Sequence, residues 1–347
     1  MPRKKRYLKF LLGLAIAIGL FLCVLISLKG KTFIISKDLS QSEIIPSGST
    51  LIFTGDIMLG RNVKKAINQY GQLSIFKDVQ GIFKSKDIII GNLEGPIIKD
   101  APIIPPGSMK FGFDPEALEI LTSLNFKVLS LSNNHTLDQG KSGYDQTIKY
   151  LNDNSLEPIG DNVRCGKDTD YYLKDKVAII AGNFTYSSTL NNCLDKTMSL
   201  IQGIKQENAD AFIVVYPHWG EEYQVINSNK QKELAHKFID NGADMVIGSH
   251  PHVVQNIELY NNKLIVYSLG NFIFDQYFSE DTQQGLVIQL DLIDKGLVVG
   301  LIPIQGDKSK LSLMPKDKEE TFLDELAQRS SEGLAKGIKA NQIVLSR

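Results

Sequence analysis

The fold of this chain is decided by residues 49–61, which read STLIFTGDIMLGR. The run Ser49–Phe53 is short, apolar and followed by a glycine, a pattern that predicts a buried strand. Asp56 comes soon after it, at the carboxyl end of the predicted strand, where ligands bind in α/β sheets. A lone aspartate at such a place more often caps the following helix, so the rest of the chain has to decide between the two roles.

The same arrangement recurs along the chain, because short runs rich in Val, Ile and Leu alternate with stretches of helical spacing. This alternation predicts an α/β fold with a largely parallel sheet covered by helices. The predicted strands are Ser49–Phe53, Asp87–Ile90, Val128–Leu131, Val177–Ala181, Ala211–Tyr216, Met245–Ile247 and Leu264–Tyr267, and the predicted helices are Pro115–Leu124, Gly143–Asn152, Leu200–Asn208 and Lys230–Asn241. Leu286–Leu292 and Leu297–Ile304 predict an antiparallel hairpin. The charged tail after Gly306 predicts one surface helix and a loose end.

Polar residues follow five of these strands and indicate a metal site. Four of the chain's five histidines lie at the strand ends, each beside Gly, Pro, Asn or Trp. Neutral imidazoles and carboxylates that converge on one rim are typical of a metal site. His250 and His252 are the strongest pair, because side chains at i and i+2 of an extended segment share one face. His236 lies on the predicted helix 230–241 and is predicted to be structural.

The order of these motifs resembles the metallophosphoesterase superfamily, and their spelling resembles the CapA/PgsA-type poly-γ-glutamate synthesis proteins. The motifs are GDIMLGR (55–61), GNLEGPI (91–97), SNNHTLDQG (132–140), HWGEEY (218–223), GSHPHVVQ (248–255) and YSLGNFIFDQ (267–276). The resemblance runs from Leu51 to Ile304. It implies a four-layer αββα sandwich of the metallo-dependent phosphatase type, with a two-metal site at the strand ends.

The resemblance also implies a set of ligands, residue by residue. They are Asp56 and His252 for the first metal, and Asn134, His218 and His250 for the second. The chain departs from the superfamily at Met58, where a ligand histidine is usual, and at Asn92, where a bridging aspartate is usual. Glu94 is the candidate replacement bridge, and Asn92 stays a candidate ligand beside it. The implied cofactor is a divalent ion, with Mn, Fe, Zn or Mg as the candidates.

If the chain is an enzyme, the expected chemistry is metal-assisted hydrolysis. His135 matches the superfamily's general acid. Arg61 follows the first motif and can stabilise transition-state charge as a guanidinium fork, or it is a solvated surface arginine. Both residues are therefore candidate catalytic groups.

Other side chains beside the motifs have open roles. Trp219 and Tyr223 either line the substrate side of the site or serve packing. Glu221 and Glu222 either orient a ligand histidine or belong to a solvated turn. The further residues expected near the rim, without a defined role, are Asn271 and Asp275.

The N-terminal segment predicts a membrane anchor. Residues 1–9 carry five basic side chains and no acid, and residues 10–28 are nineteen in number without a charge. A helix of that length spans roughly 28 Å, close to the hydrocarbon thickness of a bilayer. The basic segment is predicted to stay cytoplasmic, followed by a linker (29–49), an extracytoplasmic domain (50–305) and a C-terminal extension (306–347). A cleaved signal peptide is the alternative, but no A-x-A-like site follows residue 28.

Charge and cysteines limit the partners and the cross-links. Removing the five basic residues from the formal net charge of −1 leaves −6 for residues 10–347, which excludes a nucleic-acid-binding body. Cys23 lies in the predicted anchor. Whether Cys165 and Cys193 form a disulfide outside the membrane is left open by the sequence.

The resemblance and the anchor together indicate a single-pass protein of the cell membrane that takes part in synthesis or export of an anionic surface polymer, of the poly-γ-glutamate type. Its expected partners are the membrane and the polymer's synthase or export subunits. The alternative is a stand-alone extracytoplasmic metallohydrolase acting on phosphoesters. A third reading is a metal-stabilised binding module without turnover.

Overall fold

A computed structural model of the chain describes residues 50–71, 73–83, 88–105, 107–160, 171–174, 176–186, 190–293 and 296–346. The chain divides into two units, residues 1–42 and 43–347, and every described residue belongs to the second. The predicted cytoplasmic segment 1–9, anchor 10–28 and linker 29–49 lie outside the described residues. Within those ranges, no helix combines the length and the apolar composition that crossing a bilayer requires.

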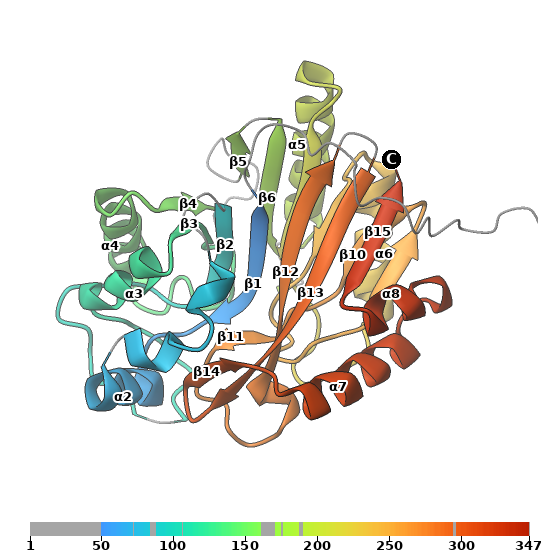
Figure 1. The fold of residues 1–347 in the computed structure, drawn as a ribbon. Helices are drawn as coiled ribbons and strands as arrows, with labels where there is room; N and C mark the ends of the chain where they lie inside the picture. Colours follow the sequence, from blue (N-terminus) through green and yellow to red (C-terminus); the bar gives the residue numbers. More distant parts are fainter. Residues whose placement is uncertain are drawn as a thin grey trace, which may run out of the picture. The chain divides into compact units, whose positions relative to one another are not determined.

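The first sheet is mixed, and its centre is the strand that follows residue 50 (Figure 1). Its strands run in the order β14-β13-β12-β1-β2-β3-β4, with β11 paired to β1 and β15 paired to β13. β1 to β4 are parallel, whereas β12 is antiparallel to β1. The strands are β1 Leu51–Ile57, β2 Ile88–Leu93, β3 Phe126–Ser130, β4 Glu157–Ile159, β11 Asn271–Ile273, β12 Gln284–Ile293, β13 Gly296–Asp307, β14 Lys310–Leu313 and β15 Gln342–Ser346.

The second sheet has a parallel centre and antiparallel edges. Its order is β5-β6-β7-β8-β10-β9, with β6, β7, β8 and β10 parallel and the outer strands β5 and β9 antiparallel to their neighbours. The strands are β5 Tyr171–Lys174, β6 Val177–Asn183, β7 Phe212–His218, β8 Met245–Ile247, β9 Ile257–Tyr260 and β10 Lys263–Val266. The mixed α/β class predicted from the sequence is confirmed.

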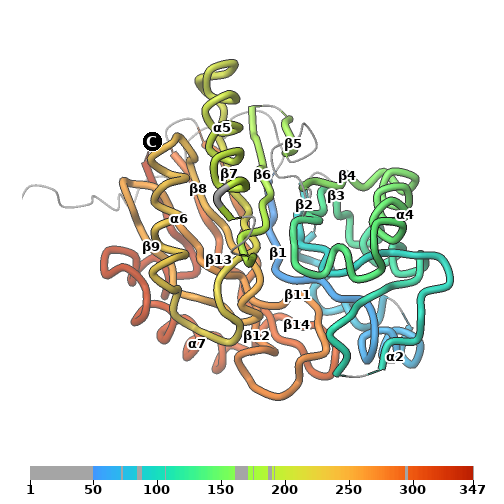
Figure 2. The backbone as a smooth tube through the Cα atoms, turned by 180° about the vertical axis from the view of Figure 1, so that it is seen from behind, coloured from blue at the N-terminus to red at the C-terminus, as the bar shows by residue number. Residues whose placement is uncertain are grey.

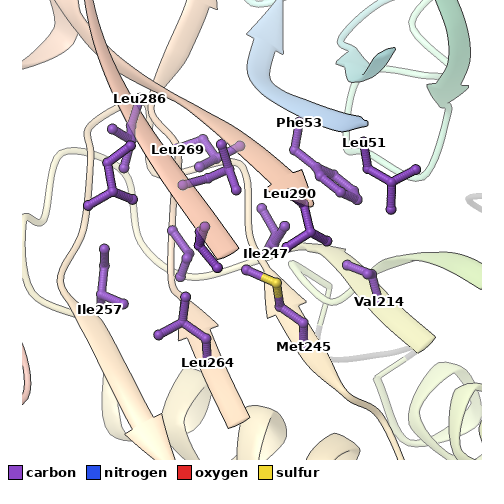
Figure 3. Packing of buried hydrophobic residues seen from close by; sticks show 14 of the residues in the cluster. Leu51, Phe53, Val214, Met245, Ile247, Ile257, Leu264, Leu269, Leu286 and Leu290 are labelled. Atoms are coloured by element: carbon purple, nitrogen blue, oxygen red, sulfur yellow. The ribbon is translucent and has the colours of Figure 1, made fainter. Parts of the chain in front are cut away.

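The two sheets pack face to face, because their strands are apolar on both sides. In β1, Leu51 and Phe53 point into the core between the sheets, where they join Met245 and Leu264 of the second sheet (Figure 3). Ile52, the residue between them, belongs instead to the core on the opposite face of the first sheet. This period of two is the geometry of a pleated strand, and burial of both faces explains the continuous apolar runs.

Helices cover the outer faces of both sheets. The first sheet's outer core contains side chains of α2, α3 and α4, and the second sheet's outer core contains side chains of α5 and α6. α5 and α6 lie along the second sheet in the view from behind (Figure 2). The helices are α2 Arg61–Tyr70, α3 Leu118–Ser123, α4 Gly140–Asp153, α5 Leu190–Glu207, α6 Asn229–Asp240, α7 Lys316–Arg329 and α8 Ala335–Lys339, with short 3₁₀ turns at Leu73–Phe76, Gln80–Ile82, Pro115–Ala117, Asp281–Gln283 and Glu332–Leu334.

The predicted element ends differ from the observed ones in a consistent way. β1, β2 and β7 continue into the polar residues that were expected to follow them, since ladder pairing continues there: Asp56 pairs with Asn92, and His218 with Asn183. The helix expected at 200–208 begins ten residues earlier, at Leu190. α2 was not predicted, because only Val63 and Ala66 of its ten residues are buried.

The predicted loose end after residue 306 is wrong. α7 buries Phe322, Leu323 and Leu326 in the core between the sheets, and β15 pairs along β13 through five residues. The tail's charges lie on the outer side of α7, and its apolar side chains are used by the same core as the rest of the domain. The predicted hairpin is confirmed, because β12 and β13 pair antiparallel.

Cys193 is disulfide-bonded and buried on α5. The chain's other two cysteines, Cys23 and Cys165, lie outside the described residues.

Candidate metal centre

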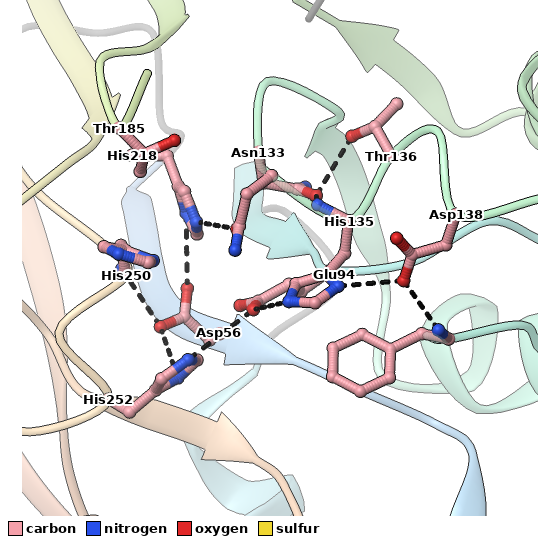
Figure 4. A network of polar contacts seen from close by, with 12 residues as sticks. Asp56, Glu94, Asn133, His135, Thr136, Asp138, Thr185, His218, His250 and His252 are labelled. Atoms are coloured by element: carbon pink, nitrogen blue, oxygen red, sulfur yellow. Dashed lines mark hydrogen bonds and ion pairs between the residues drawn. The ribbon is translucent and has the colours of Figure 1, made fainter. Parts of the chain in front are cut away.

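The predicted site residues meet at the carboxyl ends of the parallel strands of both sheets (Figure 4). Loops that follow parallel strands converge at one edge, which is why distant motifs arrive together. The residues brought together are Asp56, Asn92, Glu94, Asn134, His135, His218, His250 and His252. All of them are buried except Asn134, which is half-buried.

Asp56 is the hub of the centre and is fully buried. Its carboxylate accepts hydrogen bonds from the Asn92 side chain at 2.8 Å and from the His250 backbone N–H at 3.1 Å. One oxygen lies 3.3 Å from His252 Nδ1. The backbone before it is fixed by a close approach of two strands, because a Cβ at Gly55 would lie 1.9 Å from the carbonyl oxygen of Gly270.

Asn92 serves Asp56 as a hydrogen-bond donor. Asn133 donates to the Leu93 carbonyl at 2.9 Å and to Asn92 Oδ1 at 3.0 Å. These two bonds fix which end of the Asn92 amide carries oxygen, so its NH₂ group faces Asp56. Asn133, which the sequence interpretation passed over, is the residue that orients Asn92, and in this arrangement the Asn92 oxygen is turned toward Asn133. Asn92 as a metal ligand stays a prediction.

Glu94 is a buried carboxylate without hydrogen-bond partners in the described part of the chain. It is fully buried, and neither carboxylate oxygen has a hydrogen-bond partner among the described residues. Oε1 lies 3.6 Å from His252 Nε2 and 3.7 Å from His135 Nε2. Burial raises the pKa of Glu94 well above its usual value, and the Asp56 carboxylate adds to the rise while His252 opposes it. A buried carboxylate without partners is costly unless something else satisfies it.

His250 and His252 converge, although not for the predicted reason. Their φ angles are +98° and +58°, so this is a sharp bend and not the extended segment that the sequence argument assumed. Their rings nevertheless lie 5.9 Å apart, and Asn271 Oδ1 lies 3.0 Å from His252 Nδ1. Positive φ is unfavourable for histidine, and such backbone strain is found at binding sites.

The two imidazoles have opposite electrostatic surroundings. Burial, and then the neighbouring His252, lower the pKa of His250 to about 4, and its Nδ1 is buried without a partner in the described part of the chain. Burial also lowers the pKa of His252, but the Glu94 carboxylate and the hydrogen bond to Asp56 outweigh it and raise the value to about 9. His250 is therefore neutral and ready to donate a lone pair.

His218 and Asn134 are in direct contact, with 2.8 Å between Nε2 and Oδ1. Ser249 Oγ lies 3.1 Å from His218 Nδ1 and was not singled out in the sequence. Burial, followed by the surrounding imidazoles, lowers the pKa of His218 well below its usual value. A neutral imidazole with an oriented ring is the form that binds metals.

His135 is oriented by a carboxylate. Its Nδ1 lies 2.8 Å from Asp138 Oδ2, and its ring packs on Phe111 at 4.0 Å between centroids. Its Nε2 faces Glu94. Asp138 was not predicted, although it follows His135 by three residues in the same motif, a spacing that a single turn brings together.

Arg61 is not a solvated surface residue. Its side chain is 9% exposed, and its guanidinium forms an ion pair with Asp275 and donates to the Ser108 carbonyl at 2.7 Å. It also lies over the Phe111 ring, 4.8 Å from the centroid. Asp275, which had no defined role, holds Arg61 beside the His135 wall of the centre.

Trp219 does not line the centre and serves packing, which is one of the two roles that the sequence left open for it. It is fully buried in the core under α6, and its Nε1 donates to the Tyr267 carbonyl at 2.8 Å.

Met58 also turns inward, because it is fully buried and its sulfur accepts the Gly60 N–H at 3.1 Å. Glu221 is exposed. His236 lies away from the centre, stacked on Tyr260 and 3.0 Å from a Glu258 oxygen.

Two groups of side chains have ligand atoms that can share one ion, counting only the described residues. They are Asp56, Glu94 and His252, and Glu222, His250 and His252, and within each group the ligand atoms lie within 4.8 Å of one another. The spacing from Glu94 to its two imidazoles is longer than a hydrogen bond. It is close to the roughly 3.4 Å that separates two ligand atoms on one tetrahedral zinc ion.

These residues lie within the part of the chain that matches one protein-family model. Residues 50–276 match the family model described as "Bacterial capsule synthesis protein PGA_cap". The chain is 32% identical over 307 residues to the capsule biosynthesis protein CapA of Bacillus anthracis, covering 82% of this chain and 74% of that one. It is 31% identical over 299 residues to the PGA biosynthesis protein CapA of Bacillus subtilis, covering 80% and 78%. A solved structure of the purple acid phosphatase PPD1 from yellow lupin matches with a TM-score of 0.33 and 11% identity, over 65% of this chain and 52% of that one.

Proposed function

This chain belongs to the PGA_cap family of bacterial capsule synthesis proteins, and we propose that it takes part in synthesis or export of an anionic surface polymer of the poly-γ-glutamate type. The similarity to two CapA proteins over about four fifths of the chain carries this proposal. The two sheets packed face to face, with helices over their outer faces, support a four-layer αββα sandwich of the metallophosphoesterase type. The polymer's synthase and export subunits are the proposed partners.

The proposed cofactor is a divalent metal ion at the centre, with Mn, Fe, Zn or Mg as the candidates. The observation that supports it is Glu94, whose two buried oxygens lack any hydrogen-bond partner among the described residues. His250 Nδ1 is buried and unpartnered in the same way. A cation satisfies these atoms at once, and the mixture of imidazole nitrogens and carboxylate oxygens suits all four metals. The proposed ligands are Asp56, Glu94, Asn134, His218, His250 and His252.

The proposed location is the outer face of the cell membrane. Residues 1–9 and 10–28 support it, as a basic segment followed by an uncharged stretch long enough to span a bilayer. A single-pass anchor of this kind holds the domain beside membrane-embedded synthase subunits. Determination of the mature protein's N-terminus tests the anchor, because a chain that begins near residue 30 would have been cleaved.

The alternative function is hydrolysis of a phosphoester, and the pair His135 and Asp138 favours it. The Asp138 carboxylate accepts from His135 Nδ1 and so points Nε2 at the centre's wall, where the imidazolium form of the ring can donate a proton to a leaving oxygen. Arg61 is held nearby by Asp275, where its positive charge faces an anionic substrate. A bound divalent ion would supply the activated water and charge neutralisation that such hydrolysis needs.

Gene deletion and restoration tests the proposed function. Deleting the gene in its host should abolish the surface polymer, measured as glutamate released by acid hydrolysis of the cell-surface fraction. The wild-type gene should restore it, whereas the His250→Ala/His252→Ala variant, expressed to the same level, should not. Unchanged polymer after deletion would contradict the proposal.

Purified protein separates the two candidate functions. The full-length chain in detergent is incubated with bis(p-nitrophenyl) phosphate and added Mn²⁺. Turnover that disappears in His135→Ala supports the hydrolase, whereas absence of turnover together with loss of polymer on deletion supports an assembly role.

A further inference from the structure

Glu222 lies on the loop between β7 and α6 and is neither among the ligands that the resemblance implies nor among those of the proposed function. We propose that Glu222 is an additional metal ligand, supplied by this loop to the ion that His250 and His252 hold. The proposal rests on the metal centre of the proposed function and adds to it a ligand from a segment that the resemblance did not assign.

The first observation is the position of the carboxylate. One oxygen of Glu222 lies within 4.8 Å of a ring nitrogen of His250 and of His252. The carboxylate is half-buried and the two histidines are buried. His250 is one of the two rings that Glu222 approaches, and its Nδ1 is buried without a hydrogen-bond partner among the described residues.

The second observation is that the loop is fastened onto the bend that carries the two histidines. Tyr223 N–H donates to the carbonyl of Pro251, the residue between His250 and His252, at 2.8 Å. Tyr223 adopts a φ of +65°, an unfavourable value for a bulky residue. The backbone is therefore bent at this place, and the bend brings the preceding residue, Glu222, to the centre.

The third observation is a chain of hydrogen bonds that runs from Tyr223, the residue after Glu222, to His252. Burial, and then the Glu222 carboxylate beside it, raise the pKa of the Tyr223 hydroxyl, which accepts from Gln276 Nε2 at 3.2 Å. Gln276 Oε1 accepts from Asn271 Nδ2 at 3.0 Å, and Asn271 Oδ1 lies 3.0 Å from His252 Nδ1. Hydrogen bonds of this kind, made by the side of a ligand that faces away from the ion, orient ligands at metal sites.

The first motif leaves room for such a ligand. Met58 is buried, and its sulfur accepts the Gly60 N–H, so it does not face the ion. The strands of the first sheet therefore supply Asp56 and Glu94 alone as carboxylate ligands, and Glu222 adds an oxygen from the second sheet's side.

Metal titration of matched glutamate variants tests the proposal. The full-length protein in detergent, freed of metal by chelation, is titrated with Mn²⁺ in a calorimeter. Glu222→Gln should lower the affinity about tenfold or more, whereas Glu221→Gln, which removes the exposed neighbouring carboxylate, should stay within about threefold of the wild type.

A spectroscopic test distinguishes ligation from long-range attraction. With Cd²⁺, Glu222→Cys should give a thiolate-to-cadmium charge-transfer band in the ultraviolet that is absent from the wild type and from Glu221→Cys. Unchanged affinity in Glu222→Gln and no new band in Glu222→Cys would overturn the proposal while leaving the metal centre intact. A wild type that binds neither Mn²⁺ nor Cd²⁺ would overturn both.

Discussion

Two buried carboxylates, Glu94 and Asp244, are treated in opposite ways by the same fold. Asp244 precedes β8, at the amino end of the strand. It forms ion pairs with Lys205, at 2.8 Å, and with Lys263, and one of its oxygens accepts the Ile213 N–H at 3.0 Å. Both oxygens of Asp244 are satisfied. Glu94 follows β2 at the carboxyl end, and neither of its oxygens has a hydrogen-bond partner in the described residues.

The difference separates a buried carboxylate that the chain's own lysines and a backbone N–H satisfy from one that no group of the described residues satisfies. Asp244 ties α5, β7 and β10 together at the amino end of the second sheet, because its partners Lys205, Ile213 and Lys263 come from those elements. Glu94 makes no hydrogen bond to the described residues, and it faces the imidazoles of His135 and His252 with the Asp56 carboxylate nearby. A buried carboxylate of the second kind is stable only when a cation or a proton compensates it.

The largest expected effect concerns metal content. The His250→Ala/His252→Ala variant should lose bound metal, with affinity reduced roughly 100-fold or more, because loss of residues that merely orient ligands already costs 10–100-fold. Elemental analysis of the purified protein measures this. His236→Ala, a histidine outside the centre, is the matched control and should keep wild-type metal content. Equal metal in the double variant, or a wild type that takes up no metal, would contradict the comparison drawn above.

The next effect is on stability, and its sign should differ between the two carboxylates. Asp244→Asn should destabilise the protein by about 2 kcal/mol. Breaking a fully buried pair costs about 3–5 kcal/mol, and the lower figure allows for solvent screening, since the side chains of Lys205 and Lys263 are 27% and 33% exposed. Glu94→Gln should leave the metal-free protein as stable as the wild type or up to about 1 kcal/mol more stable, because it replaces a buried carboxyl group that has no hydrogen-bond partner among the described residues.

Urea unfolding in the presence of a chelator measures the free energy of unfolding of both variants. A second series with saturating Mn²⁺ separates them further. Metal at 100 times its Kd stabilises a protein by about 2.7 kcal/mol, so the wild type and Asp244→Asn should both gain this much. Glu94→Gln should gain little. Destabilisation of the metal-free protein by Glu94→Gln to the same extent as Asp244→Asn would mean that Glu94 supports the fold directly.

The sequence predicted which side chains meet at the strand ends better than it predicted the partners of Asp244, for a physical reason. Asp56, Glu94 and His218 each stand just after an apolar run, and the carboxyl ends of parallel strands must meet. Asp244 also adjoins a predicted strand, but its partners are 39 and 19 residues away in sequence. The sequence around Lys205 or Lys263 does not show which carboxylate each lysine contacts, so long-range ion pairs of this kind cannot be predicted before the fold is known.

Backbone conformation was the other gap between sequence and structure. The sequence argument placed His250 and His252 on one face of an extended segment. Both residues instead have positive φ and lie on a bend, where His250 contacts Asp56 and His252 contacts Asn271. β15 was missed because its apolar residues, Ile343–Leu345, stand in the charged tail after Gly306, where the sequence predicted a loose end. It becomes a strand only because β13 offers it an edge to pair with.

The smallest expected effect is the pH dependence of the Asp244 cluster. Burial raises the pKa of Asp244, but hydrogen bonds from Lys205, Lys263 and the Ile213 N–H outweigh it and hold the folded-state pKa below its usual value. A carboxyl group with a lowered folded-state pKa stabilises the protein fully above its unfolded-state pKa, which is about 3.9 for aspartate. That stabilisation is lost as the pH falls through the folded-state value. The difference in unfolding free energy between the wild type and Asp244→Asn should therefore be constant from pH 7 to pH 5 and shrink below about pH 4.

Asp145, whose carboxylate pairs with Lys141 on the exposed face of α4, provides the control: the difference between the wild type and Asp145→Asn should be small at every pH. A gap for Asp244→Asn that persists undiminished at pH 3 would show that its amide is destabilising for reasons of shape, and the supporting cluster would then owe its strength to packing instead of charge.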